Sequence, residues 1–411
     1  MRAKFLFAAM MMAALTVVSS NDSYASQLIS SYVQFGPEHP RIHSYGLEGI
    51  MPMHDARDYE PSTGLFERGT DGNFDSPRLI RLFKFDKDLN THIDEVAKHL
   101  YHKESVEQVW LYDVELPDYE VITSTPNLCK VDVNAGDQKY CPQQLIDALA
   151  TNQSLRVLTL HGDLSYLDLS PLQNLHRLAR IELINPRLSF DNVQQLGRSR
   201  SLHSLDVCLE QLPGPWLENL CKLSNVDDFA LYCGNPAGSA DRVALSAERL
   251  NFLKKLPKLR CLRLTMPADG LVVQLVSNLP KLETLTIFVS DDSIIPRLAR
   301  LKGLRALELC GSGIHGETLS ALQHSPLEYL ALVSCQLSDE GYLQLAKLQS
   351  LRALQISGAP NQVFTSQHNL LMLADLTELR LLDITVQCPD MEKVLARLSK
   401  SLPNCSMQAA F

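Results

Sequence analysis

The chain has 411 residues, of which 45% are apolar, so it is long enough to bury a large hydrophobic core. Its formal net charge is −9 and it has no run of basic residues, which argues against a nucleic-acid partner, because phosphate binding needs clustered Lys and Arg. After the first 25 residues, no segment reaches the roughly 20 consecutive apolar residues that a membrane-spanning helix needs.

The first 25 residues have the pattern of a secretory signal peptide. Arg2 and Lys4 supply a positive end, and the mostly apolar stretch 5–18 follows. Ser23 and Ala25 are small residues at the two positions that a signal peptidase reads. We therefore expect export to the periplasm, the cell envelope or the extracellular space. The alternative is an uncleaved membrane anchor, which the shortness of the apolar stretch disfavours.

Residues 26–77 contain no repeat and are dense in Gly, Pro, Asp and Ser, which predicts a loop-rich segment. We expect this segment to cap the coils that follow, or to be flexible. His39, His43, His54 and Asp55 lie close together in it, but without a helical spacing they are only a weak indication of a metal site.

The next segment resembles part of a calcium-binding EF-hand loop. Asp86, Asp88 and Asn90 match its first ligand positions, whereas Thr91 replaces the turn glycine and Ala97 stands where the bidentate Glu belongs. Because two essential residues are missing, a helix start capped by Thr91 is the favoured interpretation. We expect residues 96–103 to continue as a helix.

From residue 78 to residue 411 the chain is an array of L-x-x-L-x-L copies. Clear copies include LRALEL (304–309), LEYLAL (327–332) and LRLLDI (379–384), and LIRLFKF (79–85) is a possible further strand. Twelve copies start at 106, 128, 155, 178, 202, 226, 259, 282, 304, 327, 351 and 379. This period is typical of a solenoid, in which each repeat buries its apolar face against its neighbours.

Within each copy, Leu at motif positions 1, 4 and 6 is expected to point into the core of a short strand. A helical return should follow. In the copy at 327, Ser338 is the expected N-cap, and Leu343, Leu345 and Leu348 are the expected core residues of the helix. Long intervals around 233–241 and 357–369 predict insertions.

All ten cysteines follow the signal-like segment, so export would permit disulfides. Cys129 with Cys141, and Cys388 with Cys405, are the most local candidate pairs, although sequence alone does not fix connectivity. Cys335 is expected to be a buried free thiol.

These copies resemble the leucine-rich repeat family over roughly residues 100–405, and CQLSDEGYLQLAKLQSL (335–351) is similar to the short-helix repeats of bacterial and ribonuclease-inhibitor-like members. The resemblance implies an α/β leucine-rich repeat solenoid. It would be a right-handed horseshoe with a parallel sheet on the concave face and short helices on the convex face. It also implies that proteins or peptides bind on the concave side.

The strand positions that alternate with the leucines should line that concave face. We predict the following contact residues: Trp110, Tyr112, Asp132, His161, Arg180, Glu182, Asp206, Tyr232, Arg263, Phe288, Glu308, Tyr329 and Asp383. Asp132, Glu182, Asp206, Glu308 and Asp383 share one motif position, which predicts a broken acidic stripe that would favour a partner with basic and apolar groups. An ordinary solvated sheet without a ligand is the alternative.

Residues 311–316 match G-x-G-x-x-G, but the match falls at an ordinary repeat turn and no acidic residue follows for a ribose, so a dinucleotide site is disfavoured. No catalytic motif has usable context. We therefore predict a non-enzymatic, exported, monomeric scaffold that binds a protein or peptide and takes no cofactor or metal. The alternatives are an enzyme with its site in residues 26–77, and a secreted effector that presents substrates to a host ubiquitin machinery.

Overall fold

A computed structural model describes residues 79–83, 106–112, 125–134, 141–209, 215–233, 246–358 and 365–409. The signal-like segment, residues 26–77, the EF-hand-like loop and the helix expected at 96–103 lie outside the described residues. The described residues form two compact units. The N-terminal unit takes residues 79–232 and 255–258, and the C-terminal unit takes Cys233, 246–254 and 259–409. No described helix has the length and apolar character needed to cross a membrane.

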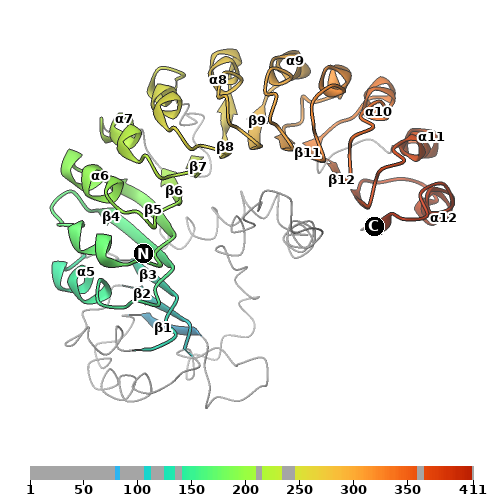
Figure 1. The fold of residues 1–411 in the computed structure, drawn as a ribbon. Coiled ribbons are helices and arrows are strands. Elements are labelled where there is room, and N and C mark those ends of the chain that lie inside the picture. The colour runs from blue at the N-terminus through green and yellow to red at the C-terminus, as the bar shows by residue number, and fades with distance from the viewer. Residues whose placement is uncertain are drawn as a thin grey trace, which may run out of the picture. The chain divides into compact units, whose positions relative to one another are not determined.

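The N-terminal unit is built from short strands that are hydrogen-bonded in the order of the chain, with helices on one side of them (Figure 1). The strands are β1 (Leu79–Phe83), β2 (Gln108–Tyr112), β3 (Lys130–Asn134), β4 (Val157–Asp163), β5 (Arg180–Arg187), β6 (Ser204–Leu209) and β7 (Asp228–Cys233). The helices are α5 (Gln143–Leu149), α6 (Phe190–Gly197) and α7 (Trp216–Asn219), with 3-10 helices at Ser170–Asn174 and Leu220–Lys222. Strands β1 to β6 pair in parallel, and the further strand predicted at 79–85 is confirmed as β1.

The C-terminal unit repeats this plan, and all its consecutive strands pair in parallel. The strands are β8 (Cys261–Ala268), β9 (Thr284–Val289), β10 (Ala306–Cys310), β11 (Tyr329–Cys335), β12 (Ala353–Gly358), β13 (Leu381–Thr385) and β14 (Ser406–Ala409). The helices are α8 (Gly270–Val276), α9 (Ile295–Leu298), α10 (Asp339–Leu345), α11 (Gln367–Leu371) and α12 (Met391–Ser401). Four 3-10 helices are at Arg249–Lys255, Asp292–Ile294, Leu319–Leu322 and Met372–Asp375.

The leucines of the motif form the core between strands and helices. In the coil of β10, Leu304, Leu307 and Leu309 are fully buried. The parallel register places Leu307 beside Leu285 of β9 and Leu330 of β11. Each buried Leu contributes about 1.5–3 kcal/mol, and it does so only because the neighbouring coils cover it. The prediction that consecutive coils stack as parallel strands is confirmed.

The helical return of the coil at 327 begins as the sequence predicts. The Ser338 hydroxyl accepts a hydrogen bond of 3.0 Å from the N–H of Gly341, so Ser338 is the N-cap of α10. Asp339 and Glu340 occupy the first turn, where the helix dipole favours negative charge.

The prediction that Leu343 is a core residue of this return is wrong. Leu345 and Leu348 are buried, but Leu343 is 45% exposed, and the fully buried Tyr342 packs inward instead. On a helix, adjacent residues point about 100° apart, so a return that buries Tyr342 and Leu345 turns Leu343 to the outside.

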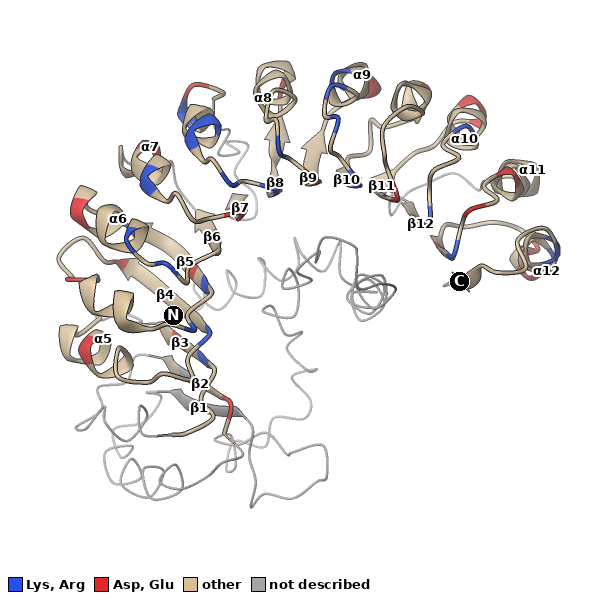
Figure 2. Cartoon of the chain, in the orientation of Figure 1, with Lys and Arg blue, Asp and Glu red and all other residues tan. Residues whose placement is uncertain are grey.

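Charged residues lie just before several strands (Figure 2). At motif position 2 they form ion pairs that join neighbouring coils. Arg260 and Glu283 form a bidentate pair with hydrogen bonds of 2.8 and 2.6 Å. Glu328 lies 3.4 Å from Arg305 of the preceding coil and 3.9 Å from Arg352 of the following coil. Alternating charge at this position therefore favours the register of the coils.

The candidate disulfides are wrong, because Cys129, Cys141, Cys388 and Cys405 are all free thiols. Three of these thiols instead approach the carbonyl oxygen of an adjacent residue within their own coil, at 3.3 to 3.8 Å. Burial raises the pKa of Cys141 to about 12, so its thiol stays protonated. Cys335 is buried and free, as predicted.

Candidate binding face

The open face of each sheet is the face that carries motif positions 3, 5 and 7, opposite the leucines. All the predicted contact residues occupy these positions, because side chains alternate along a strand. In the N-terminal unit, the register places in one row Asp132, Thr159, Glu182 and Asp206. In the C-terminal unit, the corresponding row holds Arg263, Thr286, Glu308, Ala331, Gln355 and Asp383.

Several of these side chains are more buried than an open sheet face suggests. Arg180, Asp206 and Asp383 are each 5% exposed, and Tyr329 is 8% exposed. The others with a described side chain are half-buried. Trp110 and Tyr112 lie on β2, but their side chains are outside the described part of the chain. Adjacent strands are only about 4.8 Å apart, so long side chains pack sideways on their neighbours in the row.

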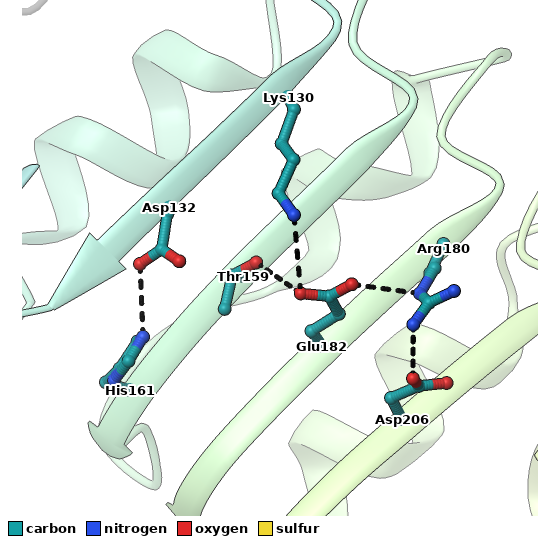
Figure 3. Close-up of polar contacts among 7 residues, drawn as sticks. All are labelled: Lys130, Asp132, Thr159, His161, Arg180, Glu182 and Asp206. Carbon is teal, nitrogen blue, oxygen red and sulfur yellow. Dashed lines mark hydrogen bonds and ion pairs between the residues drawn. The ribbon is translucent and has the colours of Figure 1, made fainter. Parts of the chain in front are cut away.

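An ion-pair network spans β3 to β6 on the open face of the N-terminal unit (Figure 3). The Glu182 carboxylate lies 3.0 Å from Nε of Arg180 and 3.8 Å from Nζ of Lys130, and it accepts a 2.9 Å hydrogen bond from the Thr159 hydroxyl. The other side of the Arg180 guanidinium pairs with Asp206 on the next strand. One Arg thus joins two carboxylates on adjacent strands.

The remaining acidic groups of this face are also paired. His161 Nε2 lies 3.1 Å from the Asp132 carboxylate (Figure 3), and the Ser204 hydroxyl donates to the buried Asp228 carboxylate at 3.1 Å. Buried or half-buried charges are stable only when they are paired or hydrogen-bonded. The side chains of this face therefore hold one another in fixed positions.

The predicted broken acidic row is present in the N-terminal unit, but its charge is offset within the chain. Glu182 and Asp206 do share a row, but Lys130 and Arg180 neutralise them within the chain. Lys130 and Thr159 were not among the predicted contact residues. The sequence places Lys130 at motif position 3 and Thr159 at motif position 5, so the alternation of side chains could have assigned both to the open face.

The open face of the C-terminal unit combines apolar residues with polar ones such as Thr286, Glu308 and Asp383. A cluster of buried residues lies there, separated from the leucine core by the strands themselves, with Phe288 packed against its edge. We call it the open-face cluster. It consists of Ala306, Cys310, Tyr329, Ala331, Val333, Ala353 and Leu381. Only Tyr329 and Phe288 were predicted as contact residues, because sequence reasoning favoured charged and aromatic side chains over aliphatic ones.

Two carboxylic acids border this cluster. Glu308 accepts hydrogen bonds from the Thr286 hydroxyl at 3.2 Å and from the Cys310 thiol at 3.5 Å. Burial raises the pKa of the Cys310 thiol well above its usual value, so the thiol remains protonated and can donate.

Asp383 is the second acid and differs from every other carboxylate of the open face. Among the described residues its carboxyl group has no hydrogen bond and no ion pair, and its register partners Gln355 and Gln408 are neutral. Burial raises the pKa of Asp383 to about 6. The nearest cation in its row is Arg263, five strands and so about 24 Å away.

The glycine-rich segment 311–316 is a structural turn. A Cβ on Gly313 would lie 1.9 Å from the Ser290 carbonyl oxygen, so the close approach of two coils requires glycine there. The Asp292 carboxylate accepts hydrogen bonds of 3.0–3.2 Å from the backbone N–H groups of residues 315–317. The donors that would hold a phosphate in a dinucleotide site are therefore occupied by the chain's own carboxylate.

Within the part of the chain that the structure describes, no three His, Cys, Asp or Glu side chains gather to hold a metal ion. The histidines at 39, 43 and 54 and the EF-hand-like loop lie outside that part.

No protein-family model matches the sequence, and no curated protein matches it. Similar solved structures include an internalin of Listeria monocytogenes, at 19% identity and a TM-score of 0.40, over 79% of this chain and 95% of that one. TLR13 in its complex with ssRNA13 is similar at 14% identity and a TM-score of 0.43, over 76% of this chain and 54% of that one. A leucine-rich repeat protein of Leptospira interrogans is similar at 16% identity and a TM-score of 0.31, over 80% of this chain and all of that one.

The arrangement of the strands, the buried leucines and the helices defines the fold of this chain. Consecutive L-x-x-L-x-L copies add parallel strands in register, bury leucines at positions 1, 4 and 6, and return through short helices on one side of each sheet. This chain has the leucine-rich repeat fold.

Proposed function

We propose that this protein is a non-enzymatic scaffold that binds a protein or peptide on the open face of its sheets. The observation that carries the proposal is the open-face cluster. Apolar side chains such as Tyr329, Val333 and Leu381 gather there on the side of the strands opposite the leucine core. The cluster residues are themselves at most 9% exposed, so a ligand would contact the cluster at its edge, where Phe288 is half-buried.

The polar groups of the open face favour binding over catalysis. In the N-terminal unit, Arg180, His161 and the carboxylates beside them are engaged with one another. A general acid or base must instead be free to reach a substrate proton. A nucleic-acid ligand is disfavoured in the C-terminal unit, because the open face of β9–β13 bears carboxylates and no Lys or Arg to neutralise phosphates.

Export is part of this proposal and rests on the first 25 residues alone, with their positive end, apolar stretch and small residues before position 26. The mass of the chain recovered outside the cytoplasm would show cleavage after Ala25. Recovery of the uncleaved chain with membranes would contradict it.

Site-specific photo-crosslinking tests the binding face. A photoreactive phenylalanine analogue replaces Phe288, which is half-buried at the edge of the open-face cluster, in the cells that produce the chain. The matched control replaces Phe190, which is 50% exposed on α6 on the helical side. A discrete adduct from position 288 and none from position 190 is expected. Adducts only from position 190, or equal adducts from both positions, would contradict binding on the open face.

The substitution Phe288→Glu provides a second measurement. It places a negative charge at the apolar edge. It should abolish the adduct formed from a photoreactive residue at Ser357, which lies in the same row three strands away. Tyr329→Ser is a poorer choice, because Tyr329 is 8% exposed and its truncation would also destabilise the fold, as loss of a large buried side chain costs about 3–5 kcal/mol.

A further inference from the structure

The open faces of the two units differ in their balance of charge. In the N-terminal unit, the carboxylates that lie on β3 to β6 have side-chain partners within the chain: Asp132 contacts His161, and Glu182 and Asp206 share Arg180. In the C-terminal unit, the open face of β9–β13 contains carboxylates and apolar groups but no Lys, Arg or His at any of its positions 3, 5 and 7. The residues at those positions are Thr284, Thr286, Phe288, Ala306, Glu308, Cys310, Tyr329, Ala331, Val333, Ala353, Gln355, Ser357, Leu381, Asp383 and Thr385.

We propose that the open face of β9–β13 binds a peptide segment that presents apolar side chains beside a Lys or Arg. This inference rests on the proposed function and names the chemistry of the ligand. The apolar side chains contact the edge of the open-face cluster at Phe288, and the cation pairs with the carboxylate of Asp383.

The charge argument depends on what surrounds Asp383. Asp383 is 5% exposed, its neighbours in the row are the neutral Gln355 and Gln408, and no described residue pairs with it. A buried carboxylate without a counter-charge is unfavourable, so a chain that keeps one gains from a ligand that supplies the cation. Lys and Arg have stems long enough to follow an apolar surface and reach the accessible edge of a recessed group.

The apolar argument depends on the cluster beside it. Leu381 is on the same strand as Asp383, two residues earlier, and both belong to the open face. Tyr329 is fixed by a 3.3 Å hydrogen bond from its hydroxyl to Oε1 of Gln355, which is the register partner of Asp383. The half-buried Phe288 closes the patch on β9. Aromatic anchors with a charged group at their border are typical of the centres of protein interfaces.

The dimensions suit a short extended peptide. Phe288 on β9 and Asp383 on β13 are four strands apart, which is about 19 Å at the usual strand spacing. An extended peptide rises about 3.3 Å per residue, so about six residues cover this distance. A ligand of this length contacts both the aromatic edge and the carboxyl group.

The test uses the chain from residue 26 to residue 411 and two labelled nine-residue peptides that share Leu and Phe at the same positions. One peptide carries Lys at its remaining positions and the other carries Glu. Fluorescence anisotropy is expected to show binding of the Lys peptide at least tenfold tighter than that of the Glu peptide. Asp383→Asn should weaken binding of the Lys peptide about tenfold. The matched control Glu248→Gln removes the same charge from an exposed position before β8 and should leave the affinity unchanged.

Equal affinities of the two variants would mean that only net charge attracts the peptide, and would overturn the proposal. Equal binding of both peptides by the unmodified chain would do the same. Failure to bind either peptide, together with self-association in light scattering, would assign the face to a second copy of the chain. In each of these cases, crosslinking from position 288 would still show whether the open face binds a partner, so the two proposals fail separately.

Discussion

Replacing the Asp383 carboxyl group by an amide should make this protein more stable at neutral pH. Burial raises the pKa of Asp383 from 3.8 to about 6, and no cation among the described residues pairs with it. Each pKa unit corresponds to about 1.36 kcal/mol, so the ionised carboxylate opposes folding by up to about 3 kcal/mol. Asn has nearly the same shape and no charge, and Asp383→Asn should therefore recover most of this free energy above pH 7.

The sign of the pH dependence follows from linkage. The folded state binds the Asp383 proton more tightly than the unfolded state, so the wild type loses stability as the pH rises from about 4 to above 6. The advantage of Asp383→Asn should be about 3 kcal/mol at pH 7.5, about 1.5 kcal/mol at pH 5 and small at pH 4. Arg380, which precedes the strand, is charged and pairs with Glu378. The Cys405 thiol, which precedes β14, is neutral in this pH range because burial raises its pKa to about 11.

Urea unfolding of both chains at pH 5 and pH 7.5, followed by circular dichroism, measures this difference. Asp390→Asn is a control of opposite sign. Hydrogen bonding and charge from Lys393 lower the pKa of Asp390, so its removal should decrease stability at pH 7.5 and have less effect at low pH. If Asp383→Asn is no more stable than the wild type at pH 7.5, or if its advantage does not shrink at pH 5, the carboxyl group is not an uncompensated charge.

Two further substitutions test the packing of the two units. Arg180→Ala removes the cation that pairs with the buried Asp206 carboxylate and leaves Glu182 with Lys130 alone. It should reduce the free energy of unfolding by about 3–5 kcal/mol, measured by urea unfolding at pH 7.5. A loss below about 1 kcal/mol would show that the network is solvated. Gly313→Ala should lower the melting temperature by several degrees, because the new Cβ would lie 1.9 Å from the Ser290 carbonyl oxygen. Gly303→Ala should leave the melting temperature almost unchanged, because the atom nearest to its new Cβ is 3.4 Å away. Equal melting temperatures for the two glycine variants would contradict the close approach of the coils.

The fold could be predicted because one residue type at fixed spacing carries it. Leu at positions 1, 4 and 6 can be buried only if neighbouring coils stack in parallel, and the register of β9, β10 and β11 shows this arrangement. The error at Leu343 arose where the spacing no longer applies. The return segments are short α-helices and 3-10 helices of different lengths, so which of their leucines face inward depends on where each helix begins.

The candidate cysteine pairs failed for a related reason. Closeness in the sequence was taken as closeness in space, but in a solenoid each coil displaces the chain by one strand. Residues about 24 apart become neighbours, and residues 12 to 17 apart lie on opposite sides of a coil. Cys129 instead occupies position 2 of its motif, beside Glu107 and Arg156 of the adjacent coils. Burial has the largest effect on its thiol and raises the pKa. The charge of Glu107 raises the pKa further, and the charge of Arg156 lowers it.

The chemistry of the binding face was harder to predict, because it depends on diagonal neighbours. Asp206 and Asp383 occupy the same motif position and are equally buried. Asp206 has an Arg at position 3 of the preceding strand, whereas the residue at that place for Asp383 is Ala353. Position 5 of one coil must therefore be read together with position 3 of the coil before it. By that rule the same residue type completes an ion-pair network in the N-terminal unit, whereas in the C-terminal unit it has no cationic partner among the described residues.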